Sequence, residues 1–267
     1  MKEREERESK TDQSNAMSST STTDRRDADA AIVIRPATVS DVRDISRIMA
    51  AAFIDNEVMG DYLFPRRREY PQDYLRHFRR MVREHIVQQG RRVIVAVIGP
   101  AIVGMASWER QGPAGIMQLP SSTVCESIRR LAVWGWNYAS HLLRPDRAMN
   151  TKNWAIFYAD AGNWKRHWTG AREETWYLDL LCVHPECQGK GVGKSLVAEG
   201  IEWAKQDAVC ASVISSAMGD GFYDKMGFVT VGSATEGALK GIPGGNIKFF
   251  EEHLARGDSA DHVGSDS

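Results

Sequence analysis

The feature that most constrains the fold is a glycine-rich run, Gln188 to Lys194, which directly follows an apolar stretch from Leu178 to Val183. Behind it, the apolar spacing from Lys194 to Ala208 predicts a helix. A strand that passes through a glycine-rich turn into a helix directs free backbone N–H groups, and the positive end of the helix dipole, toward one point. The sequence therefore predicts a phosphate site at this turn.

Three phosphate-binding patterns compete for the turn. The dinucleotide pattern Gly-x-Gly-x-x-Gly fails because Lys194 occupies the position of its third glycine. Gly193, Lys194 and Ser195 match the end of a nucleotide-binding P-loop, but Gln188 stands in place of its first glycine. The third pattern, Gln/Arg-x-x-Gly-x-Gly/Ala, is satisfied at every position by Gln188, Gly191 and Gly193.

The rest of the chain alternates between strand-like and helix-like patterns. Apolar runs predict strands at residues 31–35, 93–98, 102–108, 176–183, 209–215, 228–232 and 246–250. Apolar residues at helical spacing predict helices at residues 42–53, with Ser40 as a cap, and at 74–88, 124–143, 194–208 and 221–226. Strands dominate with helices between them, so the expected class is α/β (α+β).

Composition limits the cellular setting and the partners. Residues 1–28 and 254–267 are polar and are expected to be disordered tails around a single domain at 29–253. The N-terminal segment lacks a secretory hydrophobic core, and residues 93–108 are too short for a membrane span, so we expect a cytoplasmic or nuclear protein. The 34 basic and 35 acidic residues give no global reason to expect nucleic acid as a partner. The four cysteines show no Cys-x-x-Cys spacing, so we expect no metal.

Two separated motifs resemble the GNAT superfamily of N-acetyltransferases. The segment from Leu178 to Gly193 is similar to the central strand and acyl-CoA loop of the family, and the segment from Gly221 to Phe228 is similar to its Tyr-Glu-Lys-Leu-Gly-Phe segment. The order of the predicted elements agrees as well. The resemblance implies the GNAT fold, a mixed central sheet flanked by helices, and an acyltransferase that uses acetyl-CoA.

The resemblance also implies how the donor binds. Backbone N–H groups from Gly189 to Lys194 are expected to cradle the pyrophosphate of coenzyme A, with Lys190 or Lys194 adding charge, although either lysine alone is equally consistent with a solvated helix start. The family places the pantetheine arm beside the central strand. The implied donor-binding residues are Leu181, Cys182, Val183, Gln188, Gly189, Lys190, Gly191, Val192, Gly193 and Lys194.

Tyr223 is the candidate proton donor. It matches the tyrosine that the family places near the sulfur of coenzyme A, where a phenol can protonate the departing thiolate. The alternative is a tyrosine that only packs in the core.

Asp179 is the candidate base, because it is a lone carboxylate within the apolar strand, where arylalkylamine acetyltransferases of this superfamily place a catalytic histidine. By strand alternation it should share a face with Tyr177, Leu181 and Val183. The alternative for Asp179 is a salt bridge to a nearby arginine. Glu173 and Glu174 are further candidates, acting through water.

The chain departs from the family pattern by an insert at about residues 112–172, before the central strand. Five of the eight tryptophans lie in it: Trp134, Trp136, Trp154, Trp164 and Trp168. These aromatic side chains could line a pocket for an apolar or aromatic amine. Alternatively, they could only pack the insert onto the sheet.

The sequence favours an acetyl-CoA-dependent N-acetyltransferase that acts on the primary amine of a small molecule, by direct attack in a ternary complex. The two alternatives are a non-catalytic acyl-CoA-binding module and an acetyltransferase of protein or peptide amines. A homodimer is left open.

Overall fold

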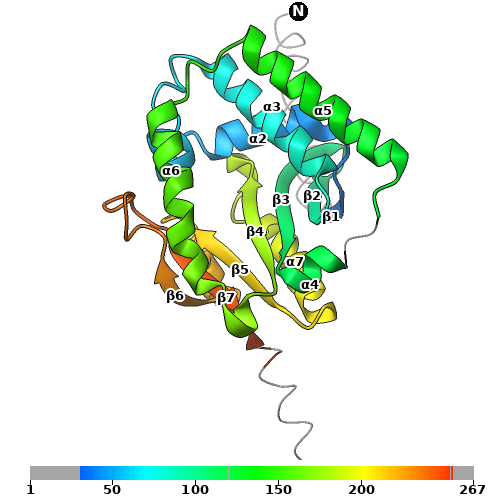
Figure 1. Ribbon diagram of the computed structural model, residues 1–267, viewed down its shortest axis with the longest axis vertical. Helices are drawn as coiled ribbons and strands as arrows, with labels where there is room; N and C mark the ends of the chain where they lie inside the picture. The colour runs from blue at the N-terminus through cyan, green and yellow to red at the C-terminus, as the bar shows by residue number, and fades with distance from the viewer. Residues whose placement is uncertain (1–30, 119–120, 253, 255–267) are drawn as a thin grey trace, which may run out of the picture.

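The computed structural model describes residues 31–118, 121–252 and 254 (Figure 1). The predicted disordered tails lie outside this part of the chain, apart from Leu254, and the domain boundaries at 29 and 253 stay a prediction. The strands are β1 (Val33–Pro36), β2 (Arg91–Ile98), β3 (Ala101–Gln111), β4 (Thr175–Val183), β5 (Cys210–Ser215), β6 (Val229–Ser233) and β7 (Asn246–Phe250). The α-helices are α2 (Val42–Ala52), α3 (Pro71–Val87), α4 (Pro113–Met117), α5 (Val124–Leu143), α6 (Thr151–Trp164), α7 (Val192–Gln206) and α8 (Asp220–Lys225).

The strands form one seven-stranded sheet in the order β1-β2-β3-β4-β5-β7-β6. All neighbouring strands are antiparallel except β4 and β5, which run parallel. Helix α7 connects these two strands, as a parallel pair requires. The mixed central sheet flanked by helices is therefore confirmed, with β4 at its centre.

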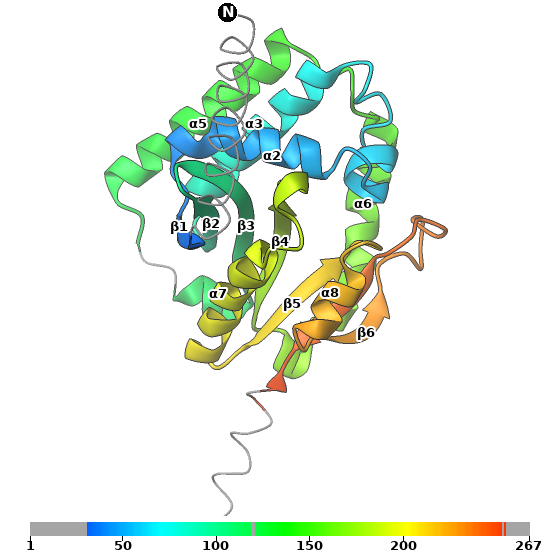
Figure 2. The same ribbon diagram turned by 180° about the vertical axis from the view of Figure 1, so that it is seen from behind.

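Helices cover both faces of the sheet (Figures 1 and 2). Helices α2 and α3 pack their apolar residues against one face, and α7 packs its apolar stripe against the other. Helix α7 approaches the sheet closely at Gly200, which lies directly over the fully buried ring of Trp108 on β3. This packing fixes α7, and with it the glycine-rich turn at the start of α7, relative to the sheet.

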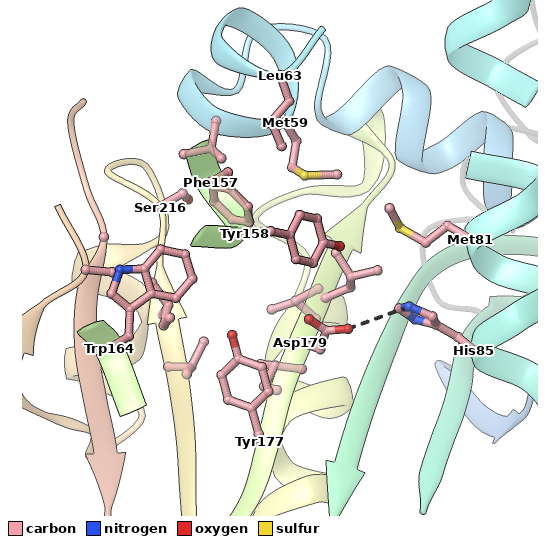
Figure 3. A pocket seen from close by; sticks show the side chains of 18 of the residues that line it. Met59, Leu63, Met81, His85, Phe157, Tyr158, Trp164, Tyr177, Asp179 and Ser216 are labelled. Carbon is pink, nitrogen blue, oxygen red and sulfur yellow. Dashed lines mark ion pairs between the residues drawn. The ribbon is translucent and has the colours of Figure 1, made fainter. Parts of the chain in front are cut away.

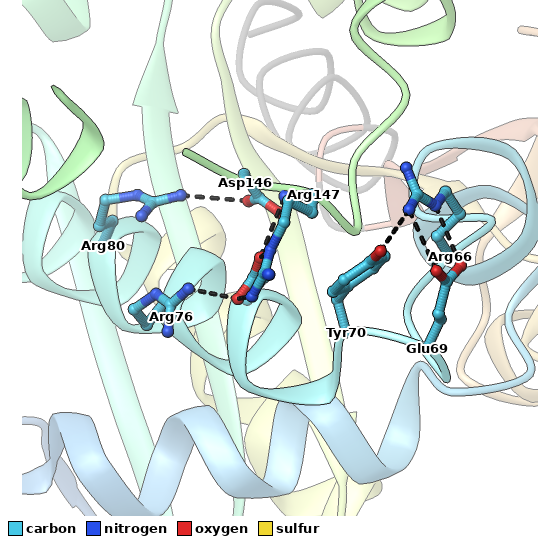
Figure 4. Close-up of polar contacts among 8 residues, drawn as sticks. Arg66, Glu69, Tyr70, Arg76, Arg80, Asp146 and Arg147 are labelled. Carbon is cyan, nitrogen blue, oxygen red and sulfur yellow. Dashed lines mark hydrogen bonds and ion pairs between the residues drawn. The ribbon is translucent and has the colours of Figure 1, made fainter. Parts of the chain in front are cut away.

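The predicted insert consists of α4, α5 and α6, and the predicted helix at 124–143 matches α5. The connection between α5 and α6 is held to α3 by two carboxylates whose side chains are each 1% exposed (Figure 4). Asp73 pairs with Arg76 and Arg147, and Asp146 pairs with Arg80. Buried carboxylates need such partners, so these contacts fix the insert over the sheet.

One local expectation needs correction, and one turn was not anticipated. Ser40 does not cap the first helix: a 3-10 turn, Val39–Asp41, precedes α2. There the Asp41 carboxylate accepts a hydrogen bond from the Thr38 N–H at 2.7 Å and pairs with Arg35. A π-helical turn, Glu57–Tyr62, was not predicted from the sequence. The Asn56 side chain caps this turn by accepting two backbone N–H groups, a local contact that apolar periodicity does not reveal.

Candidate active site

Strands β4 and β5 separate at the centre of the sheet. They pair only from Thr175 to Leu178, while β4 continues to Val183 and β5 continues to Ser215. Within the described residues, the β4 edge from Asp179 to Val183 therefore has no strand beside it on the β5 side. Unpaired backbone N–H and C=O groups along such an edge can bind an extended ligand as another strand would. The predicted pantetheine contacts, Leu181, Cys182 and Val183, all lie on this edge.

A β-bulge lies at the point of separation. Leu178 pairs with Trp108 and Leu180 pairs with Ser107, so Asp179 is an extra residue on β4 without a partner on β3. The predicted face of Asp179 is therefore only partly right.

Tyr177 and Asp179 do line one cavity on the α3 side of the sheet. Beyond the bulge, however, Leu181 and Val183 pack into the core under α7, while Leu180 and Cys182 pack on the α3 side. The extra residue shifts the alternation by one position, which strict period-two spacing does not anticipate.

The glycine-rich turn has the geometry that anion binding requires. Gly189 and Gly191 have φ of 75° and 84°, in the left-handed region that favours glycine, and Gly191 is the N-cap of α7. The Gln188 amide donates to the Val183 carbonyl at 3.2 Å, which ties the turn to the end of β4. Lys190 is exposed beside the turn.

The start of α7 adds backbone donors to this turn. The first N–H groups of a helix have no acceptor within the helix, so those that follow Gly191 are available to a phosphate. Val192 is buried and can offer only its backbone, whereas Lys194 is exposed. Gly193 lies inside the helix, where an added Cβ would be 3.6 Å or more from other atoms, so close packing does not require a glycine there.

A cavity of about 1230 Å³ lies on the α3 side of the sheet. It is bounded by α3, by the insert helices α5 and α6, and by the ends of β4 and β5, and it is lined mostly by apolar side chains. Both predicted catalytic residues, Asp179 and Tyr223, line it. The residues of the glycine-rich turn do not, so the phosphate site and the cavity meet only through the gap between β4 and β5.

Asp179 has the arginine partner that the sequence left open, and it also faces the cavity (Figure 3). Its Oδ2 lies 2.5 Å from Arg91 Nη1 and 3.7 Å from His85 Nε2. Its side chain keeps 28% of its surface exposed. The Asp179 carboxylate therefore forms the salt bridge that was the alternative and is also accessible from the cavity.

Tyr223 lies on α8 beneath the gap, with its ring against Phe222 and Phe228. Burial raises the pKa of its phenol, so the hydroxyl stays protonated at neutral pH and can only donate a proton there. Lys248 of β7 pairs with Asp220 and Asp224, which flank Tyr223 on α8, and so holds this helix in place.

Glu173 and Glu174, the two alternative carboxylates, differ in their contacts. Glu174 pairs with Arg110 and accepts the backbone N–H groups of Ala114 and Gly115, so it caps α4. That use makes Glu174 a structural residue. Glu173 is exposed and lines the cavity.

The insert aromatics both pack and line the cavity. Those that line it are Trp134, Tyr138, Trp154, Phe157, Tyr158, Trp164 and Trp168. Trp154 and Phe157 also pack against the core beneath α2 and α3, and Trp164 and Trp168 pack against the core of β5 to β7. Trp136 is exposed and does not line the cavity. Both expectations for the insert therefore describe part of it.

Sequence reasoning placed Tyr177 on the face of Asp179 but did not indicate that His85 and Tyr158 lie around the same carboxylate. Figure 3 shows Tyr177 and Tyr158 with their hydroxyls directed into the cavity, and His85 beside Asp179. His85 comes from α3, Tyr177 from β4 and Tyr158 from the insert.

The described ranges contain no cluster of three or more His, Cys, Asp or Glu side chains suited to a metal ion. Among the helices of those ranges, none combines the length and the apolarity that a bilayer crossing requires. Burial raises the pKa of the Cys182 thiol to about 12, so this cysteine on the donor edge stays a neutral thiol.

Comparisons with known proteins agree with the motifs. Residues 148–244, which include Asp179, the glycine-rich turn and Tyr223, match the family model of the acetyltransferase (GNAT) domain. A protein of Stachybotrys chartarum named acetyltransferase is 26% identical over 212 residues, which cover 74% of this chain and 81% of that protein.

Solved structures were compared as well. A histone acetyltransferase HPA2 and related acetyltransferase structure from Corynebacterium glutamicum is 17% identical, with a TM-score of 0.49, over 82% of this chain and 94% of that chain. A GNAT family acetyltransferase from Brucella melitensis, in complex with acetyl-CoA, is 13% identical, with a TM-score of 0.39, over 75% and 84%.

The family match covers both motifs that the sequence singled out. The expected enzyme class and the expected acyl donor, acetyl-CoA, are confirmed. The part of this chain that the family model covers, residues 148–244, is a GNAT acetyltransferase domain.

Proposed function

We propose that this enzyme transfers the acetyl group of acetyl-CoA to the primary amine of a small molecule, by direct attack in a ternary complex. The observation that carries the proposal is the position of the cavity. It opens on the free edge of β4, on the face opposite α7, and two candidate proton-transfer residues, Asp179 and Tyr223, line it. A small acceptor bound there would approach the thioester through the gap between the strands.

The residues present fit the donor. The backbone N–H groups between Gly189 and Lys194 would hold the pyrophosphate, and the β4 edge from Leu181 to Val183 would hold the pantetheine arm. When bound, acetyl-CoA supplies an activated acetyl thioester. The protein itself contributes a fixed edge, an anion site and a protonated phenol at Tyr223.

On the acceptor side, Asp179 would attract the amine and promote loss of its proton. Tyr177 and Tyr158 add two hydroxyls at the same place, and the apolar wall around them would hold the body of the acceptor. The size of the cavity and its cover by the insert favour a small molecule over a peptide, because α5 and α6 lie across the face that an extended chain would need.

Release of coenzyme A tests the proposal. Acetyl-CoA should be consumed with at least one member of a panel of aliphatic and aromatic primary amines. We expect Tyr223→Phe and Asp179→Asn each to lower kcat by about 10²-fold or more, because general acid–base groups contribute 10²–10⁴-fold.

The alternatives give other results. Saturable acetyl-CoA binding without turnover on any small amine or peptide would favour the non-catalytic module. Turnover on peptides but on no small amine would favour a protein acetyltransferase.

A further inference from the structure

His85 and Asp179 face each other at the cavity wall (Figure 3). The 3.7 Å between His85 Nε2 and Asp179 Oδ2 is too long for a hydrogen bond. The other ring nitrogen of His85, Nδ1, lies 3.0 Å from the hydroxyl of Ser107, which is fully buried on β3. When Nδ1 carries the ring proton and donates a hydrogen bond to the Ser107 hydroxyl, Nε2 presents a free lone pair beside the carboxylate.

The Asp179 carboxylate is already engaged. Its Oδ2 accepts a charge-assisted hydrogen bond from Arg91 Nη1 at 2.5 Å, and Arg91 in turn pairs with Glu109 at 3.0 Å. An oxygen held in this way serves better as a fixed negative charge than as the site that receives a proton. Nε2 of His85 has no hydrogen-bond partner within the described residues.

We propose that His85 Nε2 receives the proton of the acceptor amine, that Asp179 stabilises the imidazolium that forms, and that Ser107 positions the ring. This inference rests on the proposed function and names its proton acceptor. The amine nitrogen forms a C–N bond to the acetyl carbon, and the C–S bond breaks. The proton from nitrogen goes to His85, and Tyr223 supplies a proton to sulfur. Return of the His85 proton to Tyr223 through solvent restores both groups.

The surroundings keep His85 neutral and ready to accept a proton. Burial, with a further contribution from Arg91, lowers the pKa of His85 to about 4, although Asp179 opposes the shift. The hydroxyls of Tyr158 and Tyr177 face the same space from α6 and β4. Glu84, the preceding residue on α3, accepts the Asn137 amide at 2.9 Å. A neutral imidazole next to a carboxylate can take up a positive charge during the reaction without starting out charged.

Chemical rescue tests the proposal. With an amine that the wild-type enzyme acetylates, His85→Ala should lower kcat by 10²–10⁴-fold. Added imidazoles should restore part of the rate, and more basic imidazoles should restore more. His167→Ala is the matched control, because His167 lies in the 3-10 turn Lys165–His167 and does not line the cavity. The control should keep its rate and should not respond to imidazole.

A second variant and a spectroscopic measurement guard against misfolding. His85→Gln can still donate toward Ser107 but has no base, so it should fold like the wild type, bind acetyl-CoA with unchanged Kd and lose as much kcat as His85→Ala. Nitrogen-15 NMR at pH 7 should show His85 as the neutral tautomer with the proton on Nδ1.

The outcomes are distinguishable. A His85→Gln enzyme with more than a tenth of wild-type kcat, or an Nε2–H tautomer, would overturn this inference alone. A wild-type enzyme that acetylates no amine would overturn the proposed function as well.

Discussion

The packing of Gly200 against Trp108 predicts how Gly200→Ala changes stability. The result depends on two opposing effects, the helix propensity of alanine and the clash of its Cβ with the Trp108 ring. Gly200 lies inside α7, where alanine is normally more favourable than glycine by about 1 kcal/mol. A Cβ at this position would stand only 2.1 Å from Trp108 Cε2, whereas carbon atoms in contact are normally about 3.5 Å apart or more. The helix or the ring must therefore move by more than an ångström.

Neither group can move freely, because Trp108 has no exposed surface and α7 is buried along the same face. Overpacking a tight core costs about 1–3 kcal/mol, and occasionally more. With the upper end of this range and the helix gain of about 1 kcal/mol, we expect Gly200→Ala to lower the free energy of unfolding by about 2 kcal/mol. For a domain of this size, that corresponds to a fall in Tm of roughly 4–8 °C.

Urea unfolding followed by circular dichroism measures the effect. Gly135→Ala is the matched control, since Gly135 also lies inside a helix but an added Cβ would meet nothing within 4 Å. The control should be more stable by about 0.5–1 kcal/mol. Trp108→Phe combined with Gly200→Ala should cost less than the sum of the single changes, because the smaller ring relieves the clash. A Gly200→Ala protein as stable as the wild type would refute the reasoning.

Three further changes test the supports of the site. Asp146→Asn should lower the free energy of unfolding by about 3 kcal/mol, because Asp146 is 1% exposed and its loss leaves the buried charge of Arg80 uncompensated. The exposed Asp44→Asn should cost less than about 0.5 kcal/mol in the same urea titration. Lys248→Met should lower kcat about tenfold with little change in the Kd of acetyl-CoA, because α8 loses its ion pairs. Asp41 pairs with Arg35 and Asp73 pairs with Arg147, and these contacts lower both carboxyl pKa values to about 2. The two ionised carboxylates therefore stabilise the fold above about pH 4, and this stabilisation is lost toward pH 2. Between pH 6 and pH 2.5 the wild type should therefore lose unfolding free energy. This loss should exceed that of the Asp41→Asn, Asp73→Asn double variant by about 2–4 kcal/mol.

Much of the fold could be predicted from the sequence because its elements carry local signals. The apolar run after residue 175, the glycine turn and the periodic helix behind it gave β4 and α7 within a few residues, and β7 was placed at its observed bounds. The capping of α2 and the π-helical turn were missed. Both depend on side-chain hydrogen bonds, which apolar spacing does not report.

The candidate site was predictable on the donor side and much less on the acceptor side. The donor loop is continuous in sequence, so its glycines and lysines could be identified together. The acceptor side joins His85, Arg91 and Asp179 from three elements separated by up to 94 positions along the chain. One signal was available for His85, which lies four residues after Met81 on the apolar stripe of its helix, a costly place for a polar ring without a use.

The register irregularity at Asp179 connects the two sides of the site. Parallel pairing with β5 ends at Leu178, and the bulge places the next residue out of register with β3. The first leaves the β4 edge beyond Leu178 without a strand on the β5 side. The second places Leu180 and Cys182 on the α3 side and Leu181 and Val183 in the core under α7, whereas strict alternation after Asp179 would exchange these two pairs. In the function that we propose, a single strand therefore offers its backbone edge to the extended donor and the side chains of Tyr177 and Asp179 to the acceptor.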